Sequence, residues 1–416
     1  MPCARIAASA ALLVVAAMTI AGCTADTPVP SPSPSATFAV TGDGVLRIGT
    51  LFPLTGATAA QGQAQVAGVE LAVREVNAAG GVAESPVEVF HRNAVDAATA
   101  TAGFAALVER GVDVVVGPES AELVQLLGAD AAAAGVLIVS TSLVTPAPLA
   151  EATTAAAPMV VGLQPAGGAQ GDELGRLLGE DGAARVALVS IAAETDPALA
   201  EGLRATLAGT GSRLAVSTVV APAETDFTRL LAVIDKSRAD VIVLTAPAGA
   251  SADVVAVVLR LAEAGYAGDR LWFAIGATVS YTGALPPGAL DGARGLAPGA
   301  ALPAAFVAAL GQSDPSLPSS TYAGEAHDAV VLAALAATVG GDDGGAAIGR
   351  FLRGVSSGGI PCRSFAECLH VLTTDPDIDF AGVSGALDLT EDGAVATGGY
   401  ARMIFTADNA PVAFVN

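Results

Sequence analysis

The chain has 416 residues, enough for two folded lobes, and 52% of them are hydrophobic against 14% charged, which is typical of a globular protein. Its 19 basic and 41 acidic residues give a net charge of −22, which argues against nucleic acid or an anionic membrane surface as partners because both would repel it. The acidic excess by itself indicates only a well-solvated surface.

The first residues are typical of an export signal. Arg5 supplies positive charge, and the apolar segment 6–20 has the length of a secretion signal rather than of a membrane span. It runs into "IAGC", which ends at Cys23 and resembles the lipobox of bacterial lipoproteins. That resemblance implies cleavage before Cys23 and a diacylglycerol on its thiol; the alternative is an ordinary signal peptide with a chance cysteine. We expect a lipoprotein signal peptide over 1–22.

Residues 23–44 contain the run "TPVPSPSPS", which alternates Pro and Ser without apolar periodicity. This composition is typical of an extended tether. A tether between a lipid anchor and a folded body suits a receptor held at the extracytoplasmic face of the membrane, so it supports the lipobox interpretation independently.

Two cysteines remain in the body, Cys362 and Cys368, since Cys3 leaves with the signal and Cys23 carries the lipid. An exported protein lies in an oxidising compartment, which favours a local disulfide. A metal site would need further ligands, and the three His are scattered, so no metal is expected.

From residue 46 the sequence alternates continuous Val, Ile and Leu runs with segments in which apolar residues recur every three or four positions. The runs are typical of parallel strands covered on both faces, and the periodic segments are typical of helices. The predicted strands are 46–52, 87–94, 112–117 and 136–140, and the helices between them are 62–81, 97–111 and 121–135. Together they predict one doubly wound lobe.

The same alternation restarts after Pro158 and predicts a second α/β lobe. Asp226 is a plausible N-cap of one of its helices. The helices are 171–182, 196–211, 226–237 and 251–265, and the strands are 184–191, 214–220, 239–246 and 271–276. The remaining elements are helices 321–341 and 346–355 and strand 399–406. A C-terminal portion that returns to the first lobe implies several chain crossings, which make a hinge.

Catalytic and cofactor motifs are missing from the sequence. It has no phosphate-binding G-x-x-x-x-G-K-[ST], no dinucleotide fingerprint, no nucleophile elbow and no H-E-x-x-H. His327 and Asp328 are adjacent in a predicted helix, so their side chains should point about 100° apart and serve structure. We expect no enzyme activity and no cofactor.

Several segments in order resemble the type I periplasmic binding proteins, specifically the branched-chain amino acid (Leu/Ile/Val) substrate-binding proteins of ABC transporters. The segments are "GTLFPLTGATAAQGQ", "VDVVVGPESAE", "VLIVSTSLVTPAP", "DFTRLLAVIDKSRADVIVL" and "YAGEAHDAVVLAALAA". The last segment resembles a helix of the family that has a Tyr-Asp-Ala core, and His327 of this chain occupies the position of that Tyr. The resemblance implies an α/β fold of two doubly wound, Rossmann-like lobes joined by a three-crossing hinge, with lobe 1 over 45–160 and 280–400 and lobe 2 over 161–279 and 401–416.

Ligands of open α/β sheets lie beyond the carboxyl ends of the strands. These ends are the loops 52–61, 117–121, 140–145, 194–196 and 246–251. With the resemblance, they make the expected ligand-binding residues Thr55, Gly56, Gln61, Ser120, Ser142, Thr145, Glu194 and Thr195.

Some of these positions have structural alternatives. Ser120 could cap the next helix instead of holding a ligand, and Thr55 with Gly56 could only shape a turn. Asp196 is a good N-cap before Pro197, although it or Glu194 could face an ammonium group. Trp272 and Phe273 are more typical of a core strand than of a pocket wall.

Where the family has an Ala-Thr pair, this chain has Leu143 and Val144, and Ala193 and Thr195 stand for a family Asp and pocket Tyr. These departures concern specificity. The resemblance implies a lipid-anchored, monomeric extracytoplasmic protein that delivers an amino acid or similar ligand to an ABC permease. The alternatives are a ligand-sensing or scaffold lipoprotein without a transport role and an envelope hydrolase.

Overall fold

The computed structural model describes residues 41–56, 58–141, 158–165, 167–191, 196–221, 223–246, 251–299, 301–317, 319–391, 393–396 and 399–413. The signal peptide and most of the tether lie outside these residues. So do the expected lipidation site and four expected ligand residues, namely Cys23, Ser142, Thr145, Glu194 and Thr195.

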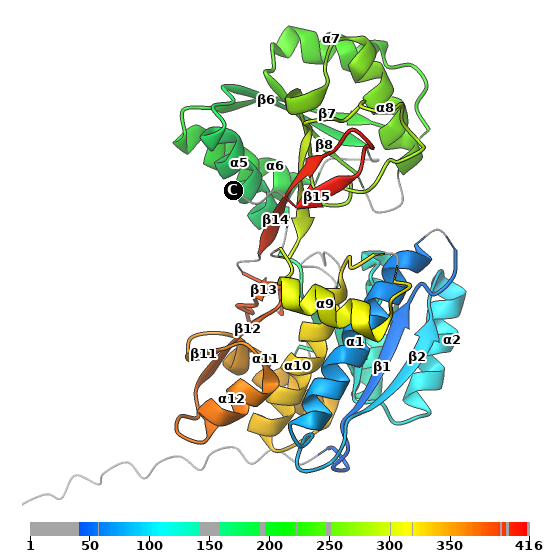
Figure 1. Cartoon of the computed structure of the whole chain (residues 1–416), viewed down its shortest axis with the longest axis vertical. Coiled ribbons are helices and arrows are strands. Elements are labelled where there is room, and N and C mark those ends of the chain that lie inside the picture. The colour runs from blue at the N-terminus through cyan, green and yellow to red at the C-terminus, as the bar shows by residue number, and fades with distance from the viewer. Residues whose placement is uncertain are drawn as a thin grey trace, which may run out of the picture. The chain divides into compact units, whose positions relative to one another are not determined.

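The first sheet has five parallel strands in the order β2-β1-β3-β4-β5 (Figure 1). Their bounds are Arg47–Phe52 (β1), Glu88–Asn93 (β2), Val114–Val116 (β3), Leu137–Ser140 (β4) and Val160–Gly162 (β5). Strands β3, β4 and β5 are rich in Val, Ile and Leu and completely buried, because helices cover both faces. The predicted doubly wound lobe is confirmed, with β5 as a strand that the sequence analysis missed.

Helices pack on both faces of this sheet and enclose two hydrophobic cores. One face carries α2 (Ala97–Val108) and α3 (Ala121–Ala134), and the other carries α1 (Ala59–Ala78), α10 (Ala323–Gly340) and α11 (Gly345–Ser356). α10 is buried over nearly its whole length. We call this sheet and its helices the first lobe.

A small subdomain completes the first lobe beside α10 and α11. It contains α12 (Phe365–Leu372) and a three-stranded sheet of β11 (Ile360–Cys362), β12 (Ile378–Gly382) and β13 (Gly385–Ala386). The remaining helix of the lobe, α9 (Ala304–Ser313), packs against α1 and the start of α10. A disulfide between Cys362 and Cys368 joins β11 to α12, which confirms the predicted pairing.

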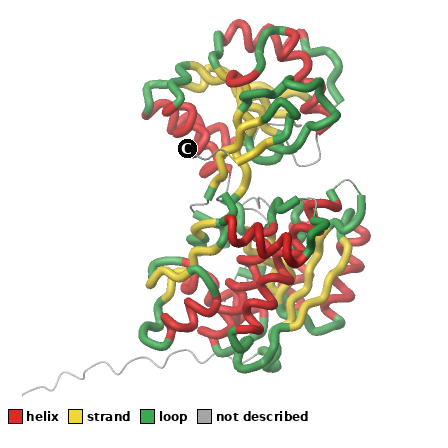
Figure 2. The backbone as a smooth tube through the Cα atoms, in the orientation of Figure 1, coloured by secondary structure: helices red, strands yellow, loops and turns green. Residues whose placement is uncertain are grey.

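The second sheet has seven strands in the order β15-β14-β10-β9-β8-β6-β7, and we call it and its helices the second lobe (Figure 2). The strands are β6 (Arg185–Ile191), β7 (Arg213–Val220), β8 (Val241–Thr245), β9 (Leu271–Phe273), β10 (Arg294–Pro298), β14 (Tyr400–Phe405) and β15 (Pro411–Ala413). The helices are α5 (Gly167–Glu180), α6 (Pro197–Gly209), α7 (Thr228–Ser237) and α8 (Ser251–Glu263). One core lies under α5 and α6 and another under α7 and α8.

The chain passes between the two sheets after β5, after β10 and after β13. The second passage comes later than residue 280, where the sequence suggested it. Tyr281, Leu285 and Leu290 pack in the core of the second sheet, and β10 adds a strand there before α9 begins. The sequence analysis missed both β10 and α9.

Helix caps in the second lobe follow the sequence prediction in one case of two. Asp196 caps α6, because its carboxylate accepts the backbone N–H groups of Ala198 (2.9 Å) and Leu199 (3.3 Å). The prediction for Asp226 was wrong by one residue, since α7 starts at Thr228 with Phe227 as its N-cap. The Asp226 carboxylate still accepts the N–H of Thr228, at 3.0 Å.

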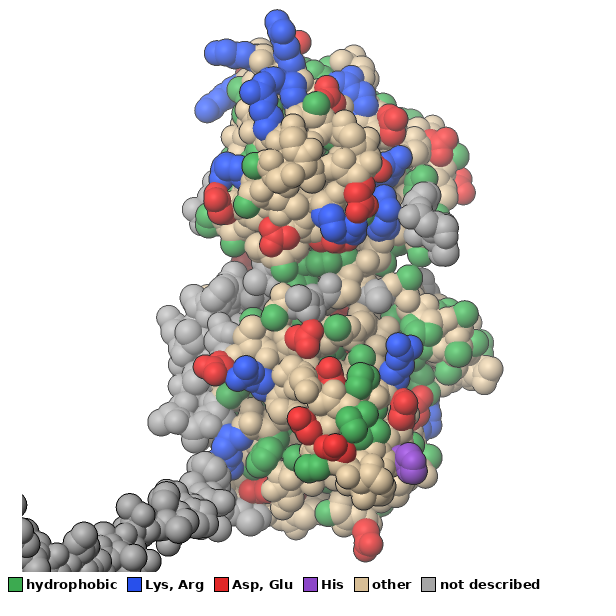
Figure 3. Space-filling model, turned by 90° about the vertical axis from the view of Figure 1, so that its left-hand side faces the viewer, with side chains coloured by type: hydrophobic (Ala, Val, Ile, Leu, Met, Phe, Trp, Pro, Cys, Tyr) green, Lys and Arg blue, Asp and Glu red, His purple; other side chains and the backbone are tan. Residues whose placement is uncertain are grey.

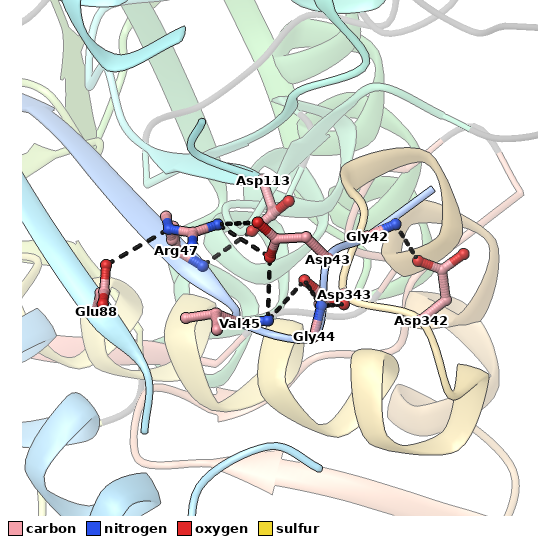
Figure 4. A network of polar contacts seen from close by, with 9 residues as sticks. All are labelled: Gly42, Asp43, Gly44, Val45, Arg47, Glu88, Asp113, Asp342 and Asp343. Atoms are coloured by element: carbon pink, nitrogen blue, oxygen red, sulfur yellow. Dashed lines mark hydrogen bonds and ion pairs between the residues drawn. The ribbon is translucent and has the colours of Figure 1, made fainter. Parts of the chain in front are cut away.

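The chain enters the first sheet through a segment fastened by two neighbouring carboxylates (Figure 4). Asp342 accepts the backbone N–H groups of residues 41 and 42 at 2.9 and 2.8 Å. Asp343 accepts those of residues 44 and 45 at 3.0 and 3.1 Å. Both carboxylates follow α10, so the turn after that helix holds the start of the folded chain.

Arg47 extends this network along the amino end of the sheet. Its guanidinium pairs with Asp43 at 2.9 Å and Glu88 at 3.4 Å, while its backbone N–H donates to Asp113 at 2.9 Å. Burial raises the pKa of Asp113 to about 7.

No group of described acidic, Cys or His residues is arranged to hold a metal ion.

No single described helix is both long and apolar enough to cross a membrane. α10 and α11 reach the required composition only as a pair, and the pair is bent by 100°.

Candidate functional site

The carboxyl ends of β1, β3 and β4 meet at one edge of the first sheet, where parallel α/β sheets bind ligands. Two hydroxyl groups that end β4 are fully buried there. The Ser140 hydroxyl donates to the carbonyl of Pro118 at 2.8 Å, and the Thr141 hydroxyl donates to the amide oxygen of Gln65 at 2.6 Å. These two hydrogen bonds therefore hold the end of β4 to the segment after β3 and to α1.

Gln65 connects three elements at this edge from inside α1. Besides accepting from Thr141, its amide nitrogen donates to the carboxylate of Glu119 at 2.6 Å and to the carbonyl of Gln61 at 3.4 Å. Its side chain is completely buried. Burial raises the pKa of Glu119, and the hydrogen bond from Gln65 opposes that shift only in part.

Ser120 lies at the N-terminus of α3, directly after Glu119. It occupies the N-cap position in extended conformation, yet its side chain makes no capping hydrogen bond. Of the two roles that the sequence left open, the structure disfavours the capping one. Its side chain is partly exposed at the helix N-terminus, and a ligand contact there stays a prediction.

The loop after β1 contains the next three expected ligand residues. Gly56 has φ +86°, a left-handed conformation that favours glycine, and is exposed. The Thr55 hydroxyl accepts a hydrogen bond from Asn93 at 3.2 Å, which ties the loop to β2. Gln61 is half-buried in the first turn of α1. Thr55 and Gly56 thus shape the turn, and whether a ligand contacts them stays a prediction.

The start of α10 brings a second carboxylate to the same side. Gln164, which follows β5, donates its amide N–H to Glu325 at 3.0 Å, and both side chains are only 3% exposed. Burial raises the pKa of Glu325 to about 7, with a further contribution from Asp328. The amide oxygen of Gln164 has no hydrogen-bond partner among the described residues.

Tyr322 precedes α10 in a left-handed conformation with φ 60°. Burial, followed by the nearby carboxylates of Glu325 and Glu119, raises the pKa of its hydroxyl. Both acidic groups of this edge are therefore near enough to Tyr322 to affect its titration.

A pocket of about 310 Å³ opens beside Tyr322 and Glu325. The start of α10 supplies its polar side, and the walls are mostly small or apolar. Its lining residues are Ala297, Ala301, Leu302, Val307, Ser320, Thr321, Tyr322, Glu325, Ala401, Met403 and Ala413.

His327 and Asp328 contact each other, which contradicts the expectation that they point apart. The imidazole Nδ1 lies 3.0 Å from the Asp328 carboxylate, because a side chain of that length reaches its neighbour despite the helical rotation. The imidazole Nε2 reaches Glu75 on α1, also at 3.0 Å. Although burial lowers it, the bonds to Asp328 and Glu75 raise the pKa of His327 to about 9.

Asp328 also accepts the backbone N–H groups of Val383 and Ser384 at 3.0 and 2.7 Å. The pair therefore joins α10 to α1 and to the β12–β13 turn.

The second lobe contributes fewer described groups to the expected cleft. Trp272 and Phe273 are 1% and 0% exposed in the cores on either side of β9, which confirms their core assignment. Asp196 is engaged as the cap of α6. Near the carboxyl end of β6, the buried Ser190 hydroxyl has no partner among the described residues.

The sequence analysis did not select as site residues those that organise the first-lobe edge, although it named the loops that contain Glu119 and Thr141. They are Gln65, Glu119, Thr141, Gln164, Tyr322 and Glu325. Gln65 carried a usable signal, since it is the one polar side chain on the otherwise apolar buried face of α1. Glu325 lies on a helix whose buried residues also include His327 and Asp328. Their partners could not be deduced because they lie far away in the sequence.

The surface of the protein carries both signs of charge. On the face drawn in Figure 3, Lys and Arg side chains gather at the top of the view on the second lobe, while Asp and Glu are spread over both lobes. The pocket beside α10 contains no Lys, Arg or His among its described lining residues.

A family model described as "Periplasmic binding protein" matches residues 45–375. The matched segment starts just before β1 and ends just after α12. No curated protein matches the chain.

Solved structures of similar fold cover most of the chain. The substrate-binding protein LivJ of a branched-chain amino acid transporter from Streptococcus pneumoniae, in complex with isoleucine, is 21% identical over 89% of this chain and 100% of that chain, with a TM-score of 0.64. The leucine-binding protein LivK from Thermotoga maritima is 16% identical over 89% and 98%, with a TM-score of 0.65. An ABC-transporter solute-binding protein from R. palustris, in complex with benzoate, is 18% identical over 89% and 96%, with a TM-score of 0.63. Identities of this size show a shared fold.

Proposed function

The chain belongs to the periplasmic binding protein family, and from that premise we propose that it is the extracytoplasmic solute-binding protein of an ABC importer. It captures a small organic molecule, an amino acid or similar compound, between its two lobes. The observation that carries the proposal is the edge where β1, β3 and β4 end, with a Ser120 hydroxyl that makes no capping hydrogen bond and the pocket beside α10.

In this function the three chain passages form the hinge, and closure encloses the ligand. Ser120 and Gln61 contact the ligand from the first lobe, with Thr55 and Gly56 in the loop beside them. Ser142, Thr145, Glu194 and Thr195 complete the contacts from the remaining loops. The solved relatives support a small ligand, since LivJ holds isoleucine and the R. palustris protein holds benzoate.

A thermal-shift screen of amino acids, amines and small carboxylates tests the proposal. A ligand present at one hundred times its Kd should stabilise the protein by about 2.7 kcal/mol. X-ray scattering should show a more compact protein with that ligand. If no compound raises Tm and the scattering profile never changes, the protein is not a solute receptor.

Ser120→Ala sharpens the test at one position. Loss of a hydroxyl contact should weaken ligand binding about tenfold in calorimetry, equivalent to about 1.4 kcal/mol. Ser217→Ala is the control, since Ser217 is exposed on the edge strand β7 and should leave Kd unchanged.

Anchoring and delivery are separate parts of the proposal. Lipidation at Cys23 holds the protein to the outer face of the cell membrane, where it acts as a monomer and presents its ligand to the permease. Cys23→Ala should move the protein from the membrane fraction to the soluble fraction. Cross-linking of the ligand-loaded protein in cells should recover an ABC permease.

A further inference from the structure

The two carboxylates at the first-lobe edge have neutral partners. Glu119 receives the amide N–H of Gln65 at 2.6 Å, and Glu325 receives that of Gln164 at 3.0 Å. Among the described residues, neither carboxylate forms an ion pair with Lys, Arg or His, whereas buried charges are normally paired. The edge therefore holds acidic groups whose charge is not compensated.

A third acceptor lies in the same cluster. The amide oxygen of Gln164 has no hydrogen-bond partner among the described residues, although the side chain is only 3% exposed. It belongs to the same planar amide group that donates to Glu325, so it lies next to that carboxylate. Because buried acceptors are nearly always satisfied, this oxygen indicates a donor that the described residues do not supply.

Tyr322 and the pocket connect this acceptor cluster to open space. Tyr322 lies close enough to both carboxylates for each to affect its titration, and it lines the pocket of about 310 Å³ together with Glu325. The opposite walls are apolar and include Leu302, Val307 and Met403. The pocket thus combines an acceptor-rich end with a hydrocarbon-lined end.

We propose that this pocket binds a small organic cation, with its ammonium or guanidinium N–H groups on Glu325 and the Gln164 oxygen and its hydrocarbon part against the apolar walls. Glu119 contributes a second negative charge beside Tyr322. A carboxylate in that position would face the acidic side chain of Glu325, with no basic group among the described lining residues. The Gln164 oxygen next to Glu325 and the Glu119 charge that acts on Tyr322 add to the repulsion. The inference rests on the proposed function, because it names the chemical class of the captured solute.

Matched pairs of probes that share a hydrocarbon part test the charge preference directly. We would measure Tm shifts and calorimetric Kd for 3-methylbutylamine against 4-methylpentanoate, and for benzylamine against benzoate, with agmatine as a guanidinium probe. At least one cationic probe should bind, and its carboxylate counterpart should bind at least tenfold more weakly.

Isosteric variants assign the binding to this pocket. Glu325→Gln and Glu119→Gln should each weaken binding of the cationic probe tenfold or more, while circular dichroism confirms that they fold. Glu109→Gln is the matched control, because Glu109 is an exposed residue at the end of α2, and it should leave Kd unchanged.

The outcomes separate this inference from the proposed function. If carboxylates bind as well as the amines, or if Glu325→Gln leaves amine affinity intact, the cation pocket is wrong while the receptor function stands. If neither these probes nor the wider screen of solutes raises Tm, both are wrong.

Discussion

Both ends of the first sheet are rich in carboxylates, but the two ends differ in what surrounds the oxygen atoms. At the amino end, Asp342 and Asp343 each accept backbone N–H groups of the entering chain, and Asp43 pairs with Arg47. At the carboxyl end, the described partners of Glu119 and Glu325 are the neutral amides of Gln65 and Gln164. The carboxylates of the first cluster have backbone or Arg partners, whereas among the described residues those of the second have no positive partner.

This difference shows that acidic residues alone do not indicate a ligand site. They do so only where the described residues leave their charge without a positive partner. The acidic composition is shared by both ends, so charge alone would rank them equally. Backbone donors make the amino end a fastening for the chain. Uncompensated acceptors beside a pocket make the carboxyl end a candidate for recognition. Variants at the two ends should therefore affect different quantities.

The largest effect is expected from Glu325→Gln on the pH dependence of stability. The folded pKa of Glu325, about 7, lies above its ordinary value near 4.5, so the folded state holds the proton more tightly than the unfolded state. Its contribution is then fully present below pH 4.5 and is lost as pH rises towards 7, by about 3 kcal/mol. Urea unfolding at pH 5 and at pH 8 should show this decrease in the free energy of unfolding for the wild type and not for the variant.

Asp113 and His327 titrate in both proteins, so only the difference between wild type and variant reports on Glu325. Glu109→Gln should retain the wild-type pH profile, because its carboxylate is exposed. An unchanged profile in Glu325→Gln would mean that the carboxylate is hydrated in the folded protein.

The next largest effect is expected from Asp342→Ala at the amino end. The carboxylate accepts three backbone N–H groups, those of Thr41, Gly42 and Gly344. Their loss should lower the free energy of unfolding by about 2 kcal/mol without changing ligand Kd. Asp130→Ala, an exposed substitution on α3, should change neither quantity. If Asp342→Ala also raised the ligand Kd, the two ends of the sheet would be coupled, and the contrast between a structural end and a ligand-binding end would be wrong.

A smaller effect is expected from Gln65→Leu, which removes the donor of Glu119 and the acceptor of Thr141. Two buried groups lose their partner, so the free energy of unfolding should fall by about 1.5 kcal/mol. Thr141→Val removes one of these groups. The double variant should therefore lose less than the sum of the two single changes in a urea-unfolding cycle. Strict additivity would show that the two side chains do not interact.

The strands and helices of both lobes could be predicted because their signals are local. Continuous Val and Ile runs identify β3, β4 and β8, and the Asp-Pro pair at Asp196 identifies the start of α6. The disulfide could be predicted because Cys362 and Cys368 were the only thiols left in the body. The segment between β9 and α10 was missed, since its Ala, Gly and Pro content hides β10 and α9.

The candidate site was predicted only as a set of loops. Ser120 and Gln61 follow from the rule that ligands lie at the carboxyl ends of strands. The contacts Gln65–Glu119 and Gln164–Glu325 join residues 54 and 161 positions apart, and no local pattern contains them. The His327–Asp328 contact was missed for a different reason, because helical rotation fixes the direction of Cβ and not the reach of the side chain.

The smallest effect is expected from Asp43→Asn, which breaks the ion pair with Arg47 only a few residues from the Asp342 fastening. The Arg47 hydrogen bond lowers the pKa of Asp43, but the carboxylate is exposed, and exposed pairs add little to stability because water solvates both charges. We expect no measurable change in Tm at 0.15 M salt and no added salt dependence. A loss as large as that of Asp342→Ala would mean that surface charge, and not the buried backbone donors, fastens the entering chain. In that case a compensated ion pair at the surface would hold the amino end, and the contrast with the unpaired carboxylates of the carboxyl end would rest on ion pairing alone.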